Sequence, residues 1–397
     1  MKRLAVVAVA VWLAALAVSL TAQPPLDGQL IFRYETFNDE QLWTDTLRLH
    51  EAVATVTPKA ALGVGLKVDV EALPADVIAA LKANPAMLDD PAVTLALLSL
   101  NAVVGVVGRV RGGTLETIGI TCALCHSTVD NSFAPGVGSR LDGWPNRELN
   151  VGAIIAMSPV IKADPAAVAL YTSWGPGKYD PRLHAFNGST FIPLHSPTFP
   201  VLLPPAYGLR QVPFETYTAD GPISYWNSYV GVTQMGGQGS FSDPRIPLNV
   251  VQTPDLVTPK LNALRDYQLS LRAPSPPQGS FNVVAAQRGR QLFNGSAKCG
   301  TCHLEPAFTD VGRGNAFRRG PFLHAPEETG MEPVYATHSV TGKYRTTPLR
   351  GAWSRPPYFH DGSAADLPAV VTHYNQALSL GLDAAQQQDL VEYLKSL

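Results

Sequence analysis

Apolar residues recur with helical spacing in several separate segments of the chain. The segment 93–107 is almost continuously apolar, but Ser99 and Asn101 interrupt it and it is too short to cross a bilayer, so it predicts a buried helix. Residues 175–222 are rich in proline and glycine and show little periodicity, which predicts ordered loops. Helices are expected at 75–82, 91–104, 285–293 and 383–397.

The N-terminus carries a different apolar pattern, typical of an exported protein. Two basic residues precede an apolar run over 4–18, and small or polar residues follow up to Ala22. We therefore interpret residues 1–22 as a secretory signal peptide that leaves a soluble mature protein. Leu20 suits the third position before a cut poorly, so earlier cleavage and an uncleaved, marginal membrane anchor are the alternatives.

The composition is that of a globular protein with much loop. Of its 397 residues, 46% are hydrophobic and only 16% are charged, while glycine and proline contribute 33 and 34. At roughly 100–200 residues per domain, this length predicts two or three domains. The formal net charge of −2 provides no electrostatic footprint for nucleic acid or for an anionic membrane, so neither is expected as a partner.

All four cysteines occur in two matching patterns. Each pair is separated by two residues and followed directly by histidine, as Cys122-Ala123-Leu124-Cys125-His126 and Cys299-Gly300-Thr301-Cys302-His303. This CxxCH pattern is typical of covalent c-type haem attachment, because two thiols at this spacing reach both vinyl groups of one haem and the adjacent imidazole lies under its iron. The sequence therefore predicts two covalently bound haem c groups, with His126 and His303 as proximal iron ligands.

Other uses of cysteine explain this pattern less well. A disulfide or a thioredoxin-like redox pair leaves both histidines without a role, and a zinc site of four cysteines must join two pairs that lie far apart in the chain. Attachment of haem c takes place outside the cytoplasm, which agrees with the N-terminal signal. We therefore expect a periplasmic protein.

A proline-rich linker at 273–280 divides the chain. The segment 281–397 has the size of one cytochrome c domain and is expected to be the C-terminal haem c domain. The segment 23–272 is expected to be an N-terminal haem c domain, enlarged by an inserted helical segment and by long loops around its haem. Its start at 28–32 resembles 289–293, a short similarity that also arises by chance. The predicted fold class is all-α, with two cytochrome c-like haem domains.

The C-terminal segment resembles the superfamily of dihaem cytochrome c peroxidases and MauG. Four blocks carry the resemblance, namely 288–293, 299–303, Tyr344-Arg345-Thr346-Thr347-Pro348-Leu349-Arg350-Gly351 and Pro357-Tyr358-Phe359-His360-Asp361-Gly362-Ser363. The last two blocks are specific for this superfamily among c-type cytochromes. The resemblance implies an oxidoreductase that exchanges electrons with a small periplasmic cytochrome or cupredoxin.

The resemblance also implies a distal ligand for the second haem. In the family this ligand lies on the helix after the His-Asp-Gly block, as methionine in the peroxidases and tyrosine in MauG, and the corresponding residue is Tyr374. Tyr374 shares one helical face with apolar residues of 367–371, and this face would point at the haem. Met331 and His373 are alternative ligands, and a plain core position is the alternative role for Tyr374.

Two further sites follow from the resemblance. Arg350 is a candidate partner for a haem propionate, with an ordinary salt bridge as the alternative. The family also implies an interdomain calcium ion, held partly by the backbone carbonyls of Arg355 and Pro357.

The N-terminal segment follows the family pattern less closely. The family places a tryptophan between its haems in a WDGR-type segment, and the nearest stretch here is Tyr225-Trp226-Asn227-Ser228-Tyr229, without the acid, glycine and arginine. Trp226 is therefore the candidate bridge between the haems, with Trp144, Trp353 and a plain core role as alternatives.

A distal carboxylate suited to acid–base cleavage of an O–O bond is missing from its expected place. The family position downstream of the bridging tryptophan is occupied by Ile246, and no glutamate occurs between Glu215 and Glu305. Peroxide chemistry therefore loses support. Gln234 and Gln238 are candidates for placing amides near an open iron, but an amide cannot act as a general acid or base.

The same glycine-rich segment offers another interpretation, in which Met235 closes the first haem as its sixth ligand. The two glycines that follow would let the backbone approach the macrocycle, and a Met/His haem is a high-potential electron carrier. His184, His195 and Met157 are alternative ligands, and an open iron site is a further alternative.

Two functions remain in competition on the sequence. One is a periplasmic dihaem oxidoreductase of the peroxidase or MauG type; the other is a non-catalytic dihaem electron carrier in which both irons are six-coordinate. A haem-based sensor is disfavoured because no output domain is evident. An exchangeable site on the first haem would distinguish the first two, since fold alone does not fix function.

Overall fold

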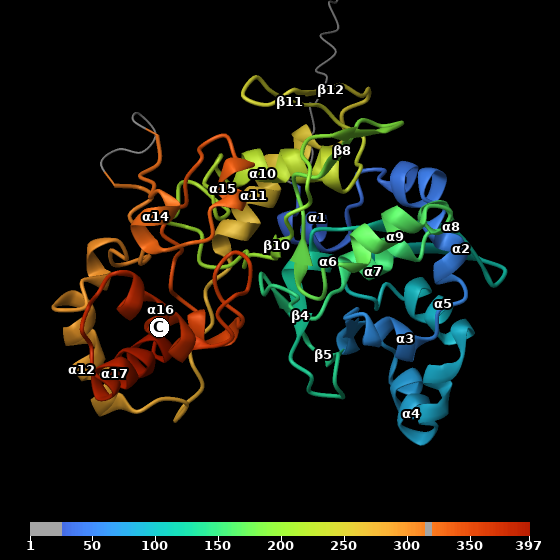
Figure 1. Ribbon diagram of the computed structural model, residues 1–397. Helices are drawn as coiled ribbons and strands as arrows, with labels where there is room; N and C mark the ends of the chain where they lie inside the picture. Colours follow the sequence, from blue (N-terminus) through green and yellow to red (C-terminus); the bar gives the residue numbers. More distant parts are fainter. Residues whose placement is uncertain (1–25, 314–319) are drawn as a thin grey trace, which may run out of the picture.

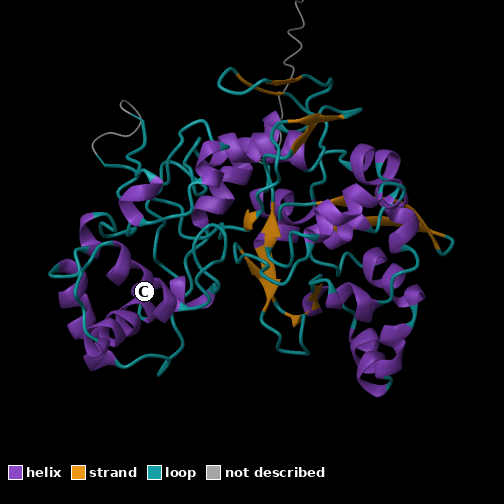
Figure 2. Cartoon of the chain, in the orientation of Figure 1, coloured by secondary structure: helices purple, strands orange, loops and turns teal. Residues whose placement is uncertain are grey.

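The computed structural model describes residues 26–313 and 320–397 (Figure 1). It is mostly helical, with short helices, small two-stranded sheets and long connecting loops (Figure 2). The predicted signal peptide at 1–22 lies outside the described residues. None of the helices in the described ranges is long and apolar enough to cross a membrane.

The helices are distributed over the whole described chain. The α-helices are α1 (Gly28–Tyr34), α2 (Leu49–Val53), α3 (Pro58–Gly63), α4 (Ala75–Ala83), α5 (Pro91–Ser99), α6 (Ala123–His126), α7 (Val151–Ala156), α8 (Pro159–Lys162), α9 (Pro165–Thr172), α10 (Ile223–Tyr229), α11 (Leu261–Ser270), α12 (Val283–Asn294), α14 (Pro326–Thr329), α15 (Val334–Thr337), α16 (Leu367–Ala377) and α17 (Ala384–Lys395). Two π-helical segments, η1 (Gln41–Thr46) and η4 (Val230–Gln234), and the 3-10 turns η2 (Val70–Ala72), η3 (Pro85–Asp89), η5 (Thr258–Lys260), η6 (Cys299–Thr301) and η7 (Ala352–Ser354) complete the set.

The strands form six separate pairs within the described residues. One pair is parallel, β1 (Val68–Asp69) with β5 (Val137–Gly138). The antiparallel pairs are β2 (Val106–Arg111) with β3 (Thr114–Ile120), β4 (Ser127–Val129) with β6 (Arg140–Asp142), β7 (Lys178–Tyr179) with β10 (Val201–Leu202), β8 (His184–Phe186) with β9 (Phe191–Pro193), and β11 (Phe241–Asp243) with β12 (Leu248–Val250).

The all-α prediction is therefore confirmed only in part, because the chain is mostly helical but also forms small sheets, and the hairpin of β2 and β3 shows where the prediction departs from the structure. The helices predicted over 91–104 and 93–107 end early, because α5 stops at Ser99 and Asn101 takes a left-handed conformation with φ of 52°. The valines that follow are β-branched and favour extended backbone. Gly112 and Gly113, both at positive φ, then supply the tight turn that returns the chain along β3.

Two helix pairs, far apart in the chain, pack in the same way. Helix α1 crosses α11 at Gly28, where an added Cβ would lie 2.0 Å from the carbonyl oxygen of Ala263. Helix α12 crosses α17 at Gly289, where an added Cβ would lie 2.0 Å from the carbonyl oxygen of Asp389. Each crossing therefore requires a glycine, because any side chain would separate the two helices.

The aromatic residues one helical turn further on repeat the same arrangement. Phe32 packs on Tyr267 with ring centroids 5.5 Å apart, and Phe293 packs on Tyr393 at 5.2 Å. The short similarity between 28–32 and 289–293 thus corresponds to one structural unit used twice, in which the first and last helices of each half of the chain pack together.

A substitution at the second crossing should reveal how tightly it is packed. We expect Gly289→Ala to lower the free energy of unfolding by about 1–3 kcal/mol, because the new methyl group overlaps the Asp389 carbonyl. Gly63→Ala is the matched control, since nothing lies within 4 Å of the added Cβ there and the substitution should be neutral or slightly stabilising. Denaturant unfolding of both variants measures the difference, and equal effects would contradict the close crossing.

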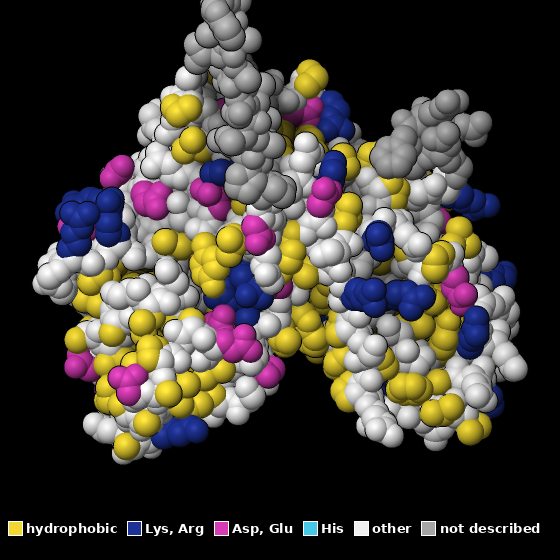
Figure 3. Space-filling model, turned by 180° about the vertical axis from the view of Figure 1, so that it is seen from behind, with side chains coloured by type: hydrophobic (Ala, Val, Ile, Leu, Met, Phe, Trp, Pro, Cys, Tyr) yellow, Lys and Arg dark blue, Asp and Glu magenta, His cyan; other side chains and the backbone are white. Residues whose placement is uncertain are grey.

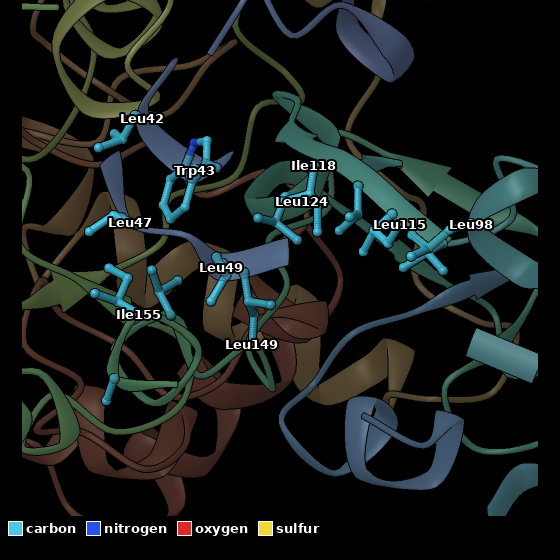
Figure 4. Close-up of a cluster of buried hydrophobic side chains, with 14 of the residues drawn as sticks. Leu42, Trp43, Leu47, Leu49, Leu98, Leu115, Ile118, Leu124, Leu149 and Ile155 are labelled. Carbon is cyan, nitrogen blue, oxygen red and sulfur yellow. The ribbon is translucent and has the colours of Figure 1, made fainter. Parts of the chain in front are cut away.

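The largest core cluster surrounds the first cysteine motif. Leu124, which lies between the two cysteines, packs in one cluster with Leu98, Leu115 and Ile118 (Figure 4). The side chains of the inserted helices α4 and α5 pack against the same cluster. The inserted segment therefore enlarges the hydrophobic core next to this motif.

The C-terminal helices α12, α16 and α17 lie together on one side of the molecule, away from α2 to α9 (Figure 1). From behind, hydrophobic side chains line a notch between the two sides, and charged groups of both signs are scattered over the surface (Figure 3). The predicted linker 273–280 contains no helix or strand, and Trp353 donates a hydrogen bond to the carbonyl of Pro274 (3.2 Å).

Candidate haem-binding site

The first cysteine motif opens into a cavity. Helix α6 carries Cys125 and His126 one turn after Cys122, and the three side chains line an apolar cavity of about 240 Å³. The backbone N–H groups of Gly143 and Asn146 donate to the carbonyls of His126 (2.8 Å) and Cys125 (3.0 Å). The motif is thereby fixed against the segment that follows it.

The cavity wall is assembled from segments that are distant in sequence. Its apolar residues include Leu98, Val106, Ile118, Ile155, Leu202, Leu203, Pro204 and Trp226. Many of the lining residues belong to the proline-rich and glycine-rich region 175–222, namely residues 201–206 and 215–217. A wide, apolar and partly enclosed space of this kind suits the flat hydrophobic macrocycle of a haem.

Both motif histidines are held in the same manner. The Nδ1 atom of His126 lies 3.0 Å from the carbonyl oxygen of Pro204, and that of His303 lies 3.0 Å from the carbonyl oxygen of Phe308. A hydrogen bond at Nδ1 fixes the tautomer and leaves Nε2 free for a metal ion. Burial lowers the pKa of both imidazoles, which favours the neutral form that binds iron.

The surroundings of the cysteines favour an uncharged sulfur. None of the four cysteines forms a disulfide. Burial raises the pKa of Cys122 and Cys125 to about 12 and that of Cys299 to about 11. These environments disfavour a thiolate, as a zinc site would require, and suit the thioether sulfur of an attached haem.

Trp226 supplies a further test of the fit. It is 6% exposed and lines the cavity, and its indole Nε1–H has no hydrogen-bond acceptor among the described residues. An unpaired buried donor is costly, so a bound group that offers an acceptor would stabilise it. Trp226 and the free Nε2 of His126 therefore both fit a haem in this cavity.

The alternative bridging tryptophans lie elsewhere. Trp144 and Trp353 pack edge to face with ring centroids 6.1 Å apart, and neither lines the cavity. Of the three tryptophans considered, Trp226 is thus the one at the first motif. Its role between two haems stays a prediction.

The structure separates the candidate sixth ligands of the first haem. Met235 and Met157 both line the cavity, whereas His184 and His195 do not. The His195 ring instead stacks on that of His338, with centroids 4.6 Å apart. The two methionines therefore remain as candidates for closing this iron.

The two candidate glutamines also differ. Gln234 lines the cavity, but its Oε1 accepts from the Tyr179 hydroxyl (2.7 Å) and its Nε2 donates to the His184 carbonyl (2.9 Å). Gln238 does not line the cavity and bonds to Asn38 and Pro254. Gln234 is thus a fixed part of the wall, and Gln238 lies outside it.

Glu215 is a cavity residue that sequence reasoning missed. It is 4% exposed, and burial raises its pKa to about 7 although Arg345 lies 3.1 Å away. Its Oε1 atom has no hydrogen-bond partner within the described part of the chain. The family pattern places the carboxylate downstream of Trp226, whereas Glu215 lies upstream. A signal in the sequence that could have identified it is that Glu215 is the only glutamate between Glu148 and Glu305.

Tyr374 lies beside the second motif. Burial, and to a smaller extent the proximity of Cys299 and Cys302, raise the pKa of its phenol. His373 is engaged through Nε2 by a backbone carbonyl (2.9 Å), and Met331 packs into a separate apolar cluster. Of the three candidates, Tyr374 interacts with both cysteines of the second motif, and its assignment as a distal ligand stays a prediction.

Arg350 lies at the surface. Its Nε donates to the Pro306 carbonyl (2.7 Å) and its guanidinium lies over the Phe308 ring at 5.3 Å. It therefore covers the edge of the second motif, next to the carbonyl that holds His303.

The carbonyl proposed as a calcium ligand already has a cationic neighbour. The Nη2 atom of Arg147 donates to the carbonyl oxygen of Arg355 at 3.5 Å. A guanidinium at this place repels a calcium ion, which also needs several oxygen ligands. The residues present around Arg355 do not fit the calcium ion that the resemblance implied.

A further cluster of potential ligands lies at the second motif. One ligand atom each of Cys302, Asp310 and His324 lies within 4.8 Å of the others. His324 Nε2 is 3.0 Å from Asp310, and its pKa is raised to about 10 by Asp310 and Cys302. A metal ion here would compete with haem attachment for Cys302, so the cluster belongs to the second motif.

Comparison with known proteins extends these observations. Over 130 residues the chain is 33% identical to the methylamine utilization protein MauG of Methylorubrum extorquens, which covers 28% of this chain and 34% of that protein. It is 28% identical to the cytochrome-c peroxidase IdrP1 of Denitromonas iodatirespirans over 149 residues, 28% of this chain and 40% of that protein. No protein-family model matches the chain.

The similarity is partial. The chain spans between about a third and a half of the length of these curated relatives. A solved structure of a MauG-like protein associated with microbial copper homeostasis overlaps 55% of this chain and 85% of its own, at 19% identity and a TM-score of 0.36. The two cysteine pairs fit the two c-type haems of the peroxidase family. Over part of its length, the chain is a distant homologue of MauG and of the dihaem cytochrome c peroxidases.

Proposed function

We propose that the protein is a dihaem c-type oxidoreductase that moves electrons between its two haems and reduces peroxide, or oxidises a substrate, at the first. The proposal rests on one observation about the two motif histidines. In each of them Nδ1 is bonded to a backbone carbonyl and Nε2 is free, and His126 lines a wide apolar cavity. A haem in this cavity would supply redox chemistry at iron.

Glu215 favours catalysis over simple electron carriage. Its carboxyl lies in the cavity wall with a pKa near 7, which suits a group that gives up and takes back a proton at neutral pH. The free Oε1 atom is the one available for that proton. Glu215 thus supplies the acid–base group that was missing downstream of Trp226.

Met235 favours the second candidate function, a non-catalytic electron carrier. It is 4% exposed and lines the cavity, so its thioether could close the first iron as a sixth ligand. Both irons would then be six-coordinate and closed to small molecules. The two functions therefore differ in whether a small ligand can reach the first iron.

A series of rings supports electron transfer between the two sites. Tyr335 lines the cavity, and its ring stacks on that of His360 with centroids 5.6 Å apart. The preceding residue, Phe359, packs edge to face on Tyr374 at 6.0 Å. These two ring pairs are joined through the backbone between Phe359 and His360, and with Trp226 they support a route between the haems.

The proposal includes a location and a partner. Haem attachment and the apolar N-terminal run of the sequence favour the periplasm. Neither the composition nor the scattered surface charge favours a polyanion, so we propose a small periplasmic cytochrome or cupredoxin as the electron partner.

The proposal is tested on the periplasmically matured protein. We expect a pyridine haemochrome assay to give two haems per chain, carbon monoxide to shift the spectrum of one reduced haem, and hydrogen peroxide to reoxidise the reduced protein rapidly in stopped-flow measurements. Two haems with no carbon monoxide shift and only slow reoxidation would establish the electron carrier instead. Fewer than two haems would overturn both.

Glu215→Gln sharpens the test. We expect the peroxide reaction to slow by about 10²–10⁴-fold, because the amide cannot exchange a proton, and the inflection of the rate near pH 7 to disappear. The carbon monoxide shift should remain. The exposed Glu327→Gln is the matched control. A peroxide rate that is unchanged in Glu215→Gln would remove Glu215 from the chemistry.

A further inference from the structure

Three arginines gather where the first motif meets the C-terminal part of the chain. Arg345 and Arg355 are 9% and 8% exposed, and the Nε and Nη1 atoms of Arg147 are buried. Burial, and to a smaller extent the charge of Arg355, lower the pKa of the guanidinium groups of Arg147 and Arg345, and Arg147 lies 3.5 Å from the carbonyl oxygen of Arg355. We call Arg147, Arg345 and Arg355 the arginine cluster.

One carboxylate partly neutralises this cluster. Glu215 pairs with Arg345, whose Nη1 lies 3.1 Å from the carboxylate and also donates to the Phe214 carbonyl at 2.7 Å. Within the described residues, no carboxylate lies within 4.0 Å of Arg147 or Arg355. The cluster therefore retains two positive charges that no acidic side chain balances.

Some nitrogen atoms of the two unbalanced guanidinium groups also lack a hydrogen-bond acceptor. Nε and Nη1 of Arg147 and Nε of Arg355 are buried without an acceptor in the described ranges. Arg355 donates to the Pro348 carbonyl (2.5 Å) and Arg147 to the Arg355 carbonyl (3.5 Å), and the Tyr217 side chain also interacts with Arg147. An arginine cannot shed its proton in a protein, and an uncompensated buried charge is costly. A bound anion would therefore stabilise this cluster.

The cluster adjoins the cavity of the first motif. Arg147 directly follows Asn146, whose N–H is bonded to the Cys125 carbonyl. Tyr217, which lines the cavity, interacts with the guanidinium of Arg147, and its carbonyl accepts a hydrogen bond from the Arg345 N–H (2.9 Å). A group bound in the cavity thus lies within reach of the arginine cluster.

We propose that Arg147 and Arg355 bind the two propionate carboxylates of the first haem. This inference rests on the proposed function, because it requires a haem in the cavity. Two carboxylates match the two unbalanced positive charges, and the fork of a guanidinium group accepts a carboxylate through paired hydrogen bonds. Arg147 precedes the linker 273–280 and Arg355 follows it, so a haem bound to both would also link the N-terminal and C-terminal parts of the chain.

The propionate role predicted for Arg350 concerns the second motif and stays a separate prediction. That side chain is exposed and is already directed to the Pro306 carbonyl and the Phe308 ring beside the second motif. The buried guanidinium nitrogens without an acceptor lie instead in Arg147 and Arg355, near the first motif.

The test compares charge-removing and charge-keeping variants in the matured holoprotein. Arg147→Gln and Arg355→Gln are made singly and together, with Arg147→Lys as the conservative variant and the exposed Arg109→Gln, on β2, as the matched control. Spectroelectrochemistry gives the two haem potentials, resonance Raman spectra report the propionate bending modes, and a pyridine haemochrome assay counts the haems. Each measurement uses chloride buffer with and without added inorganic phosphate.

We expect two haems in every variant. The potential of the first haem should fall in each glutamine variant and fall further in the double variant, because a positive charge near the haem stabilises its reduced form. The propionate bending modes of that haem should shift, while Arg147→Lys and Arg109→Gln should keep potentials close to the wild type. If the double variant fails to mature, the single variants and Arg147→Lys decide the question.

Three outcomes would overturn the proposal while leaving the proposed function intact. Unchanged potentials and Raman modes with two haems would show that the arginines do not meet the propionates. A lower melting temperature without a change in potential would show a merely structural role. A wild-type potential that depends on added phosphate would show that a free anion occupies the cluster. Fewer than two haems in the wild type would instead contradict the proposed function itself.

Discussion

Replacing His303 with alanine is expected to abolish the normal ligation of the second haem while leaving its thioether attachment largely intact. The attachment depends on Cys299 and Cys302, whereas the axial bond depends on Nε2 of His303, which the Nδ1 contact with the Phe308 carbonyl leaves free. Half of the low-spin haem absorbance should therefore be lost without loss of haem. Optical and electron paramagnetic resonance spectra of the purified variant measure this change.

Added imidazole makes the test specific. If the defect is the missing ligand, free imidazole should restore the spectrum of the second haem in His303→Ala. His338→Ala is the matched control, because His338 stacks on His195 and touches neither motif. A wild-type spectrum in His303→Ala, or a defect that imidazole does not repair, would show that His303 is not the proximal ligand.

The haem motifs and the helix pairs could be predicted because their information is local. Two thiols and one imidazole within five residues are a complete attachment site, and they need no other part of the chain to be recognised. The glycines at the two helix crossings are each followed by a phenylalanine one helical turn later. Gly28 is followed by Phe32 and Gly289 by Phe293, so the repeat is visible in the sequence. The packing of α1 on α11 and of α12 on α17 follows from that unit.

The remaining features depend on contacts between residues that are distant in sequence. The ion pair of Glu215 and Arg345 and the contact of Arg147 with Arg355 join the two parts of the chain, and no local pattern signals either one. The hairpin of β2 and β3 was missed for another reason. A continuous apolar run fits a buried helix and a buried strand equally well, and the left-handed Asn101 that ends the helix is a weak signal.

Tyr374 is the candidate distal ligand of the second haem, and its ligation stays a prediction. The family pattern places a distal ligand after the His-Asp-Gly block, and the structure places the Tyr374 phenol near Cys299 and Cys302 in surroundings that raise its pKa. The phenol is neutral in such surroundings, so it would have to release its proton to solvent or to a base before its oxygen could bind ferric iron as a tyrosinate. An anionic oxygen ligand stabilises ferric over ferrous iron and keeps the potential of this haem low.

Tyr374→Met is therefore expected to raise the potential of the second haem by an amount on the order of 100 mV or more, because a thioether favours the ferrous state whereas a tyrosinate favours the ferric state. Spectroelectrochemical titration of the matured protein measures the shift, which would convert this haem toward the methionine-ligated type of the peroxidases. Tyr374→Phe separates ligation from packing, since it keeps the ring that contacts Phe359 and removes only the oxygen. It should leave the second iron without its distal ligand and open to carbon monoxide. Potentials that stay at the wild-type value in both variants would show that Tyr374 is a core residue and that another side chain binds this iron.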